Sequence, residues 1–155
     1  MAQSVESKRS NKLLELATFY VGEALCGMDI LKIQEINKLI EMTKVPQAPD
    51  HVMGILNLRG QIVTVIDLGK KLDVSAIEIS DQSRNIIVHS ENEYIGLLVD
   101  SISDVVQTNQ EMVEPPPANI GGIQAKYLTG VFKTEESLIG ILDIDEVLRA
   151  GDVDE

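Results

Sequence analysis

The 155-residue chain has little positive charge, few aromatic side chains and a single cysteine. Lys and Arg number 13 against 25 Asp and Glu, so the formal net charge is −12. Phosphate backbones and anionic lipid surfaces repel such a charge. With two Phe, three Tyr and no Trp, the chain also lacks the stacking platforms on which nucleobase binders rely. These absences exclude nucleic acid as a partner and a direct contact with the membrane surface.

The lone Cys26 excludes an intramolecular disulfide and a thiolate metal site. So little cysteine is typical of a reducing compartment. The first residues contain no apolar segment like that of a signal peptide, and no uncharged apolar run approaches the roughly 18 residues of a membrane span. We therefore expect a cytoplasmic protein with no direct membrane insertion.

Sequence motifs of an active site are missing as well. His51 and His89 match no HxxxH or HExxH spacing, and there is no phosphate-binding loop, dinucleotide-binding motif or nucleophile elbow. The acidic group at 143–146 lacks the glycine-bearing loop of a calcium site. Cys26 lies in an apolar run, where an unreactive core thiol is expected. We expect no catalytic residues, no cofactor and no metal.

The chain is instead rich in short, strand-like segments. Ten apolar runs are separated by Gly, Pro, Asn or Asp, at 14–21, 25–28, 33–42, 53–58, 62–66, 85–89, 94–99, 102–107, 127–132 and 138–142. Such a series predicts a mainly β barrel or sandwich rather than a parallel sheet with long crossover helices. The polar residues 1–12 are expected to form a disordered arm, and residues 151–155 a frayed acidic tail.

An internal repeat divides the chain into two halves. Residues 54–72 align with 130–148 at a constant offset of 76, and residues 25–36 align with 94–105 at an offset of 69. Glycines, acidic residues and most apolar positions coincide in the two alignments. The repeat predicts two similar β lobes of about five strands each. Residues 71–84 and the three prolines at 115–117 are the predicted connectors.

Acidic residues recur at the predicted starts of short helices. Asp67 and Asp143 each follow a strand and precede a helical turn, where a carboxylate can accept a hydrogen bond from an unpaired backbone N–H. Glu146, three residues after Asp143, predicts a capping box, and Thr108 with Glu111 predicts another. These acids are therefore expected to be helix caps, and a short C-terminal helix is expected after Asp143.

The stretch VPQAPDHVMGILNLRGQIVTVIDL, residues 45–68, contains an arginine in a tight turn. Gly60 can adopt positive φ in this turn at no steric cost. Taken alone, Arg59 is a surface charge that contributes little to stability. The whole stretch, however, resembles the signature of the bacterial chemotaxis coupling proteins, the CheW family. The resemblance extends over about 14–149, through YVGEALCGMDILKIQEI, GLLVDSISDVV, EPPP and ILDIDEVL.

The resemblance implies a fold and a function. It implies one domain over 13–150, made of two intertwined five-stranded lobes of SH3-like type, in agreement with the repeats near 25–72 and 94–148. It also implies a non-enzymatic scaffold that couples methyl-accepting chemoreceptors to the histidine kinase CheA. The implied partners are the tip of the receptor's cytoplasmic hairpin and the regulatory domain of the kinase, and both would bring the protein to membrane receptor arrays.

The resemblance also implies a set of partner-binding residues. They are Ile30, Ile33, Gln34, Glu35, Gly54, Asn57, Arg59, Gly96, Ile102 and Val105. Arg59 matches the arginine expected at the receptor-facing edge, where a guanidinium can pair bidentately with a carboxylate of the partner.

Some of these positions have two interpretations. Gly96, Ile102 and Val105 match positions that line a groove between the lobes, but the two apolar side chains are equally typical of an ordinary core. Ile30 and Ile33 face either the kinase or the receptor.

Two other functions stay open. The first is a coupling role in a non-motility chemosensory kinase pathway, which co-purifying partners would identify. The second is a small β-barrel hydrolase that uses Cys26 or His51, which predicts turnover that is lost in Cys26→Ala.

Overall fold

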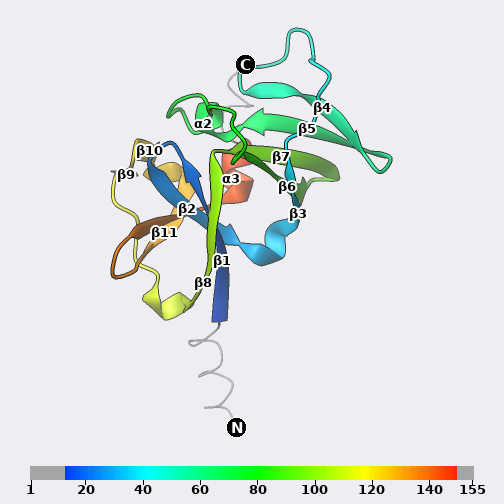
Figure 1. Cartoon of the computed structure of the whole chain (residues 1–155). Coiled ribbons are helices and arrows are strands. Elements are labelled where there is room, and N and C mark those ends of the chain that lie inside the picture. The colour runs from blue at the N-terminus through cyan, green and yellow to red at the C-terminus, as the bar shows by residue number, and fades with distance from the viewer. Residues whose placement is uncertain (1–12, 150–155) are drawn as a thin grey trace.

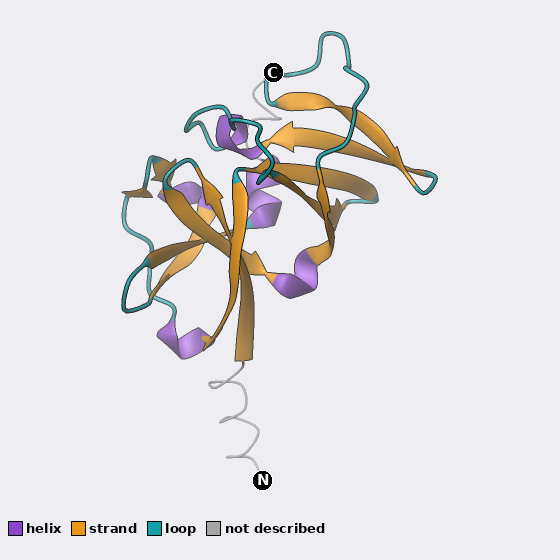
Figure 2. Ribbon diagram, in the orientation of Figure 1, coloured by secondary structure: helices purple, strands orange, loops and turns teal. Residues whose placement is uncertain are grey.

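The computed structural model describes residues 13–149, which form short strands joined by tight turns and short helical segments (Figures 1 and 2). The strands are β1 (Leu13–Val21), β2 (Ala24–Asp29), β3 (Ile33–Lys38), β4 (Val52–Leu58), β5 (Gln61–Asp67), β6 (Arg84–Ser90), β7 (Glu93–Val99), β8 (Ser101–Asn109), β9 (Asn119–Ile120), β10 (Ile123–Gln124), β11 (Leu128–Lys133) and β12 (Leu138–Leu142). The helices are α2 (Leu68–Lys71) and α3 (Ile144–Arg149), with 3₁₀ segments η1 (Ile30–Lys32), η2 (Gln110–Met112) and η3 (Ala125–Tyr127).

A strand is present at each of the ten predicted places. The third ends at Lys38 rather than at Met42, and the two-residue strands β9 and β10 were not predicted. The predicted arm at 1–12 and the acidic tail at 151–155 lie outside the described residues. In the described part of the chain, no helix is long and apolar enough to cross a membrane.

Ten of the strands form two five-stranded sheets. Sheet A has the strand order β11-β12-β2-β1-β8, and sheet B has the order β3-β6-β7-β5-β4. In Figure 1, sheet A lies at the lower left and sheet B at the upper right, with α3 near their junction. The prediction of a mainly β fold with two five-stranded lobes, short helical turns and a short C-terminal helix is confirmed.

The strand pairing follows the internal repeat residue by residue. The parallel pair β12–β2 sets Ile141 beside Gly27, and the parallel pair β5–β7 sets Val65 beside Gly96, which are the same two repeat positions. The halves also exchange strands, because β3 leaves β2 to pair with β6, and β8 leaves β7 to pair with β1. Each repeat therefore contributes to both sheets.

This exchange corrects the predicted connectors. Residues 71–84 join β5 to β6, two strands of sheet B, and the prolines at 115–117 lie between β8 and β11, two strands of sheet A. The chain passes from one sheet to the other at η1 and at Asp100 instead. The sequence repeat alone did not reveal the exchange, since each half looks self-contained when read linearly.

One hydrophobic core joins the two sheets. It includes Phe19 and Met28 of sheet A and Val63 and Leu97 of sheet B, all fully buried. Val147 of α3 is also fully buried in this cluster. Burying an aliphatic side chain of this size stabilises the fold by about 2 kcal/mol. The sheets are therefore held in place by shared apolar contacts, which fixes the surfaces on them relative to each other.

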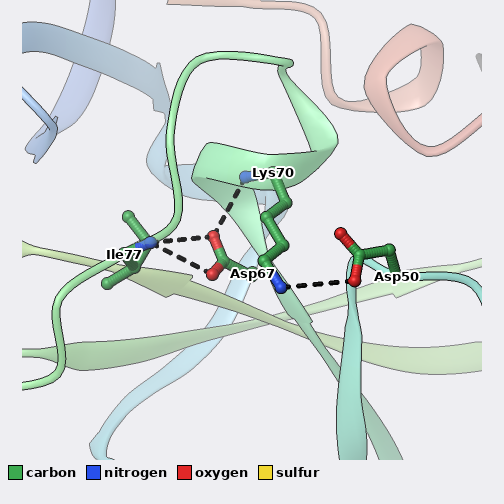
Figure 3. Close-up of polar contacts among 4 residues, drawn as sticks. All are labelled: Asp50, Asp67, Lys70 and Ile77. Carbon is green, nitrogen blue, oxygen red and sulfur yellow. Dashed lines mark hydrogen bonds and ion pairs between the residues drawn. The ribbon is translucent and has the colours of Figure 1, made fainter.

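Asp67 and Asp143 cap the two helices as predicted. The Asp67 carboxylate accepts hydrogen bonds from the backbone N–H of Lys70 at 3.0 Å and of Ile77 at 3.0 Å (Figure 3). The Lys70 ammonium lies 3.4 Å from the Asp50 carboxylate, a contact also drawn in Figure 3. Asp143 accepts from the N–H of Glu146 at 3.1 Å. Asp67 thus secures both a helix and the loop that follows it.

The two predicted capping boxes do not form. The Glu146 carboxylate pairs with Arg149 at 2.8 Å, and the Asp143 N–H donates to a backbone carbonyl. The second box was predicted one residue too early, because Asn109 and not Thr108 accepts from the Glu111 N–H, at 3.0 Å.

Candidate partner-binding site

The β4–β5 hairpin carries the arginine of the sequence motif on a two-residue turn. Leu58 pairs with Gln61, and the residues between them, Arg59 and Gly60, have φ values of 53° and 85°. The Asn57 side chain accepts a hydrogen bond from the Gly60 N–H at 2.9 Å, which supports the turn. Left-handed φ was predicted for Gly60 but not for Arg59, and it costs a residue with a β-carbon about 1 kcal/mol.

The Arg59 guanidinium forms an ion pair with the Glu35 carboxylate. Glu35 lies on β3, at the opposite edge of sheet B from β4, so the pair links the hairpin turn to the far edge strand. The Arg59 side chain is 70% exposed and that of Glu35 is 29% exposed. Exposed pairs contribute little to stability, and most of the Arg59 side chain remains accessible to another molecule.

A surface pocket of about 210 Å³ lies beside this ion pair. Gln34, Glu35 and Arg59, all predicted to be binding residues, lie together at its wall. Gln61 and Tyr94 also line it and were missed. The sequence offers one signal for Tyr94, which is among only five aromatic residues of the chain. The structure therefore brings Arg59 into one site with the adjacent residues Gln34 and Glu35, although Arg59 lies on the β4–β5 turn and not on β3.

Ile30 and Ile33 lie where the chain crosses from sheet A to sheet B. Ile30 belongs to η1 and is half-buried, and Ile33 is packed against the core. Between them Leu31 is 86% exposed, the highest value among the exposed large apolar side chains. Leu31 was missed as a binding candidate, although an apolar residue beside Lys32 in a short turn is a signal for exposure.

Gly54 and Gly96 are buried and present no side chain to a partner. A β-carbon on Gly54 would lie 2.7 Å from the carbonyl oxygen of Thr43, which crosses the edge of β4 at this point. A β-carbon on Gly96 would collide with the Asn85 amide. Both glycines therefore permit close approach within the fold.

Gly96, Ile102 and Val105, predicted to line a groove between the lobes, come from both sheets. Gly96 lies in sheet B, whereas Ile102 and Val105 lie on β8, an edge strand of sheet A. Ile102 packs against the core, and Val105 is 59% exposed. Of these three residues, only Val105 presents a large accessible apolar side chain.

The residues considered for catalysis do not form a reactive group. Cys26 is fully buried, and burial raises the pKa of its thiol to about 12, so the thiol stays protonated near neutral pH. His89 is exposed, and its ring lies 4.7 Å from that of Tyr94. No group of three or more His, Cys, Asp or Glu side chains within 13–149 is arranged to hold a metal ion.

Comparison with known proteins identifies the family. Residues 15–152 match the model of the CheW-like domain. The chain belongs to the CheW family. It is similar to the chemotaxis protein CheW of Treponema pallidum, with 34% identity over 145 residues that cover 91% of this chain and 85% of that protein. CheW of Klebsiella aerogenes is 32% identical over 136 residues, which cover 88% of this chain and 82% of that protein.

A solved CheW structure has the same fold. The scaffolding protein TtCheW of Thermoanaerobacter tengcongensis superposes with a TM-score of 0.80 at 33% identity, and the match covers 89% of each chain. Membership of the CheW family makes this chain a coupling adaptor in chemotaxis signalling.

Proposed function

We propose that the protein is a non-enzymatic adaptor that couples methyl-accepting chemoreceptors to a CheA-type histidine kinase. It acts in the cytoplasm and reaches the membrane receptor arrays through these two partners. The observation that carries the proposal is the meeting of Gln34, Glu35 and Arg59 around one accessible pocket at the end of sheet B.

The Arg59 pocket, defined by Gln34, Glu35, Arg59, Gln61 and Tyr94, is the proposed receptor contact. A guanidinium has five N–H donors, so Arg59 can keep its pair with Glu35 and still bind a carboxylate at the tip of a receptor hairpin. The left-handed φ of 53° at Arg59 supports this role, since strained backbone persists where the surrounding structure or function requires it.

The crossover at η1 is the proposed kinase contact. Two different partners that bind at once need separate surfaces, and η1 presents the accessible Leu31 with Ile30 and Ile33 beside it. An exposed apolar side chain of this size suits burial in a protein interface. The same assignment holds for a kinase of a motility pathway or of another chemosensory pathway.

The test compares binding of two purified partners, a receptor cytoplasmic hairpin and a CheA-type regulatory domain, to wild type and Arg59→Asp. Loss of the charge-assisted contact should weaken receptor binding about tenfold or more and leave kinase binding unchanged. Lys126→Asp changes net charge by the same amount at an exposed site in η3 and should alter neither.

Folding must be checked because Arg59→Asp places a carboxylate beside Glu35. Arg59→Ala avoids that repulsion and should give the same ranking of partners, with an unchanged midpoint of urea unfolding. Normal receptor binding by both Arg59 variants would refute the receptor assignment. Equal loss of both partners would indicate a general defect rather than a receptor contact.

The absence of catalysis is tested separately. A hydrolase screen with wild type and Cys26→Ala should give no turnover with either, because the thiol is buried and protonated. Turnover that disappears in Cys26→Ala would overturn the adaptor-only assignment.

A further inference from the structure

The Arg59 pocket has a counterpart at the matching place on sheet A. This second pocket, of about 470 Å³, is named here the Asp104 pocket and is lined by Tyr20, Leu25, Asp104, Glu135 and Glu136 among others. Under the two repeat offsets, every residue that lines the Arg59 pocket has its equivalent lining the Asp104 pocket. The molecule therefore carries one site twice, once on each sheet.

The backbone explains why both pockets contain a carboxylate. In sheet B the pairing of β3 with β6 shifts register between Ile33 and Glu35, and both Gln34 and Glu35 line the pocket. In sheet A the pairing of β8 with β1 shifts register at the same repeat position, and both Ser103 and Asp104 line the pocket. Such bulges redirect side chains at the edges of sheets. The same kind of bulge therefore places Glu35 and Asp104 at equivalent positions in the two pockets.

The hairpin turns that border the two pockets carry opposite charges. Glu35 is paired with the Arg59 guanidinium, but the position equivalent to Arg59 on the β11–β12 turn is Glu135, and Glu136 follows it. Figure 1 shows the two hairpin turns on opposite sides of the molecule. The Asp104 pocket thus contains three carboxylates where its counterpart contains one carboxylate and its cation.

No cation of the described chain neutralises these carboxylates. Within residues 13–149, no lysine or arginine lies within ion-pair distance of Asp104, Glu135 or Glu136. Lys133, the basic residue nearest in sequence, pairs with Glu114 at 3.7 Å. The Arg59 pocket indicates which cation fits beside Asp104, since the carboxylate at the equivalent position there, Glu35, binds a guanidinium.

The apolar part of the Asp104 pocket suits the stem of an arginine. Leu25 is half-buried in its wall, and Tyr20 is 37% exposed. An arginine can lay its methylene groups along such a wall, place its guanidinium over a tyrosine ring and bind carboxylates through its forked N–H groups. A lysine lacks the planar fork and satisfies fewer of these contacts.

We propose that the Asp104 pocket is a docking site for a partner protein segment that presents an arginine side chain. This site lies on sheet A and does not depend on the receptor contact proposed for Arg59. The two pockets then select partners of opposite charge, so that the two ends of the adaptor are not interchangeable.

The test uses the ¹⁵N-labelled full chain and two capped tripeptides, acetyl-Gly-Arg-Gly-amide and its citrulline analogue, in low salt. Citrulline keeps the shape of arginine without its charge. The arginine peptide should shift the amide signals of 103–104 and 134–137 in a saturable way, with a Kd on the order of millimolar for one side chain. The citrulline peptide should leave these signals unchanged.

Two variants of the pocket and one matched control make the test specific. Glu135→Gln should raise the Kd about fivefold, because one charge-assisted contact is lost. Glu135→Arg should abolish binding, because the new guanidinium can pair with Asp104 as Arg59 does with Glu35. Glu78→Gln changes net charge equally at an exposed site outside the pocket and should leave the Kd unchanged.

Several outcomes would overturn the proposal. Equal weakening by Glu135→Gln and Glu78→Gln would indicate general attraction to an acidic surface. Equal affinity for a lysine peptide would show that the pocket recognises positive charge and not the planar fork of the guanidinium. If the same amides shift on raising the protein concentration without peptide, the occupant is a second copy of this chain rather than a separate partner. The spectra of the variants also report whether each is folded, so a loss of binding cannot be confused with unfolding.

Discussion

Sheets A and B use the same repeat positions for their backbone contacts and different side chains for their surfaces. Gly54 and Gly130 match, and at each a β-carbon would meet a carbonyl oxygen of a crossing segment, at 2.7 and 2.8 Å respectively. At the hairpin turns, in contrast, Arg59 matches Glu135. The two sheets therefore share the same close backbone contacts where the packing is tight. Their exposed hairpin turns, where solvent tolerates substitution, carry opposite charges.

The comparison also shows one difference inside the sheets. Leu16 of sheet A packs over Gly27, and the matching position in sheet B is Asn85, which lies over Gly96. Asn85 is 1% exposed, and its side-chain carbonyl oxygen has no hydrogen-bond donor among the described residues. A buried oxygen without a donor costs about 1 to 3 kcal/mol. Sheet A also has one buried oxygen without a partner in the described part of the chain, the Thr108 hydroxyl on β8, so the two sheets bear such a cost at different positions.

The largest predicted difference concerns the two helix caps. Asp67→Ala should lower the free energy of unfolding by about 3 kcal/mol, because it removes a cap and leaves the buried Ile77 N–H without an acceptor. Asp143→Ala removes a cap at a half-buried site and should cost about 1 kcal/mol. Urea unfolding at constant m-value measures both.

The control for the caps is Asp81→Ala, which removes an exposed acid from a loop and should change stability by less than about 0.5 kcal/mol. Equal losses for Asp67→Ala and Asp143→Ala would show that the loop contact at Ile77 contributes nothing.

The second prediction tests whether the backbone frame is symmetric. Gly54→Ala and Gly130→Ala should each destabilise the fold by about 2 kcal/mol, because each methyl group would push against the backbone of a crossing segment. The two midpoints of urea unfolding should therefore fall together.

Gly60→Ala is the control for Gly54→Ala and Gly130→Ala, because it tests the cost of backbone conformation without steric crowding. Gly60 has positive φ but nothing within 4 Å of a β-carbon, so its substitution should cost only about 1 kcal/mol. If Gly130→Ala were harmless while Gly54→Ala was not, the close approach would be a property of sheet B alone.

The third prediction makes sheet B resemble sheet A in its interior. Asn85→Leu should raise the free energy of unfolding by about 1 kcal/mol, since it replaces an unsatisfied polar group with the residue found at the matching position. Asn119→Leu, at an exposed site, is the control and should have little effect. A loss of stability in Asn85→Leu would mean that the Asn85 side chain stabilises the fold in spite of its unpaired oxygen.

Local features of this fold were predictable from sequence because their causes are local. The β4–β5 hairpin follows from two apolar runs around Gly60, and the caps follow from Asp67 and Asp143 at the ends of strands. The error at Thr108 is also local, because Asn109 is an equally good cap and the start of η2 decides between them.

Features that depend on distant segments were not predictable in the same way. The pair of Glu35 with Arg59 needs the curvature of sheet B, which brings opposite edges together and leaves no periodic mark in the sequence. The exchange of β3 and β8 between sheets was implied only by the family resemblance. The roles of the ten predicted binding residues stay predictions, although the structure gathers three of them into one pocket.

The smallest predicted effect compares the turns at the same repeat position in the two halves. Gly22, in the β1–β2 turn, and Glu91, in the β6–β7 turn, have φ values of 62° and 50°. Glycine adopts this region without steric cost, whereas glutamate does not. Glu91→Gly should therefore stabilise the fold by about 0.5 kcal/mol, since the relieved strain exceeds the greater freedom of glycine in the unfolded chain.

Two further variants test whether backbone strain causes the effect of Glu91→Gly. Gly22→Ala should destabilise by about 1 kcal/mol, opposite to Glu91→Gly, because it introduces the strain that Glu91 already bears. Glu91→Ala keeps a β-carbon and removes the charge, so it should leave stability unchanged if strain is the cause. If Glu91→Ala and Glu91→Gly were equally stabilising, the effect would come from removing one negative charge from a chain of net charge −12, and the two turns would differ in electrostatics rather than in backbone strain.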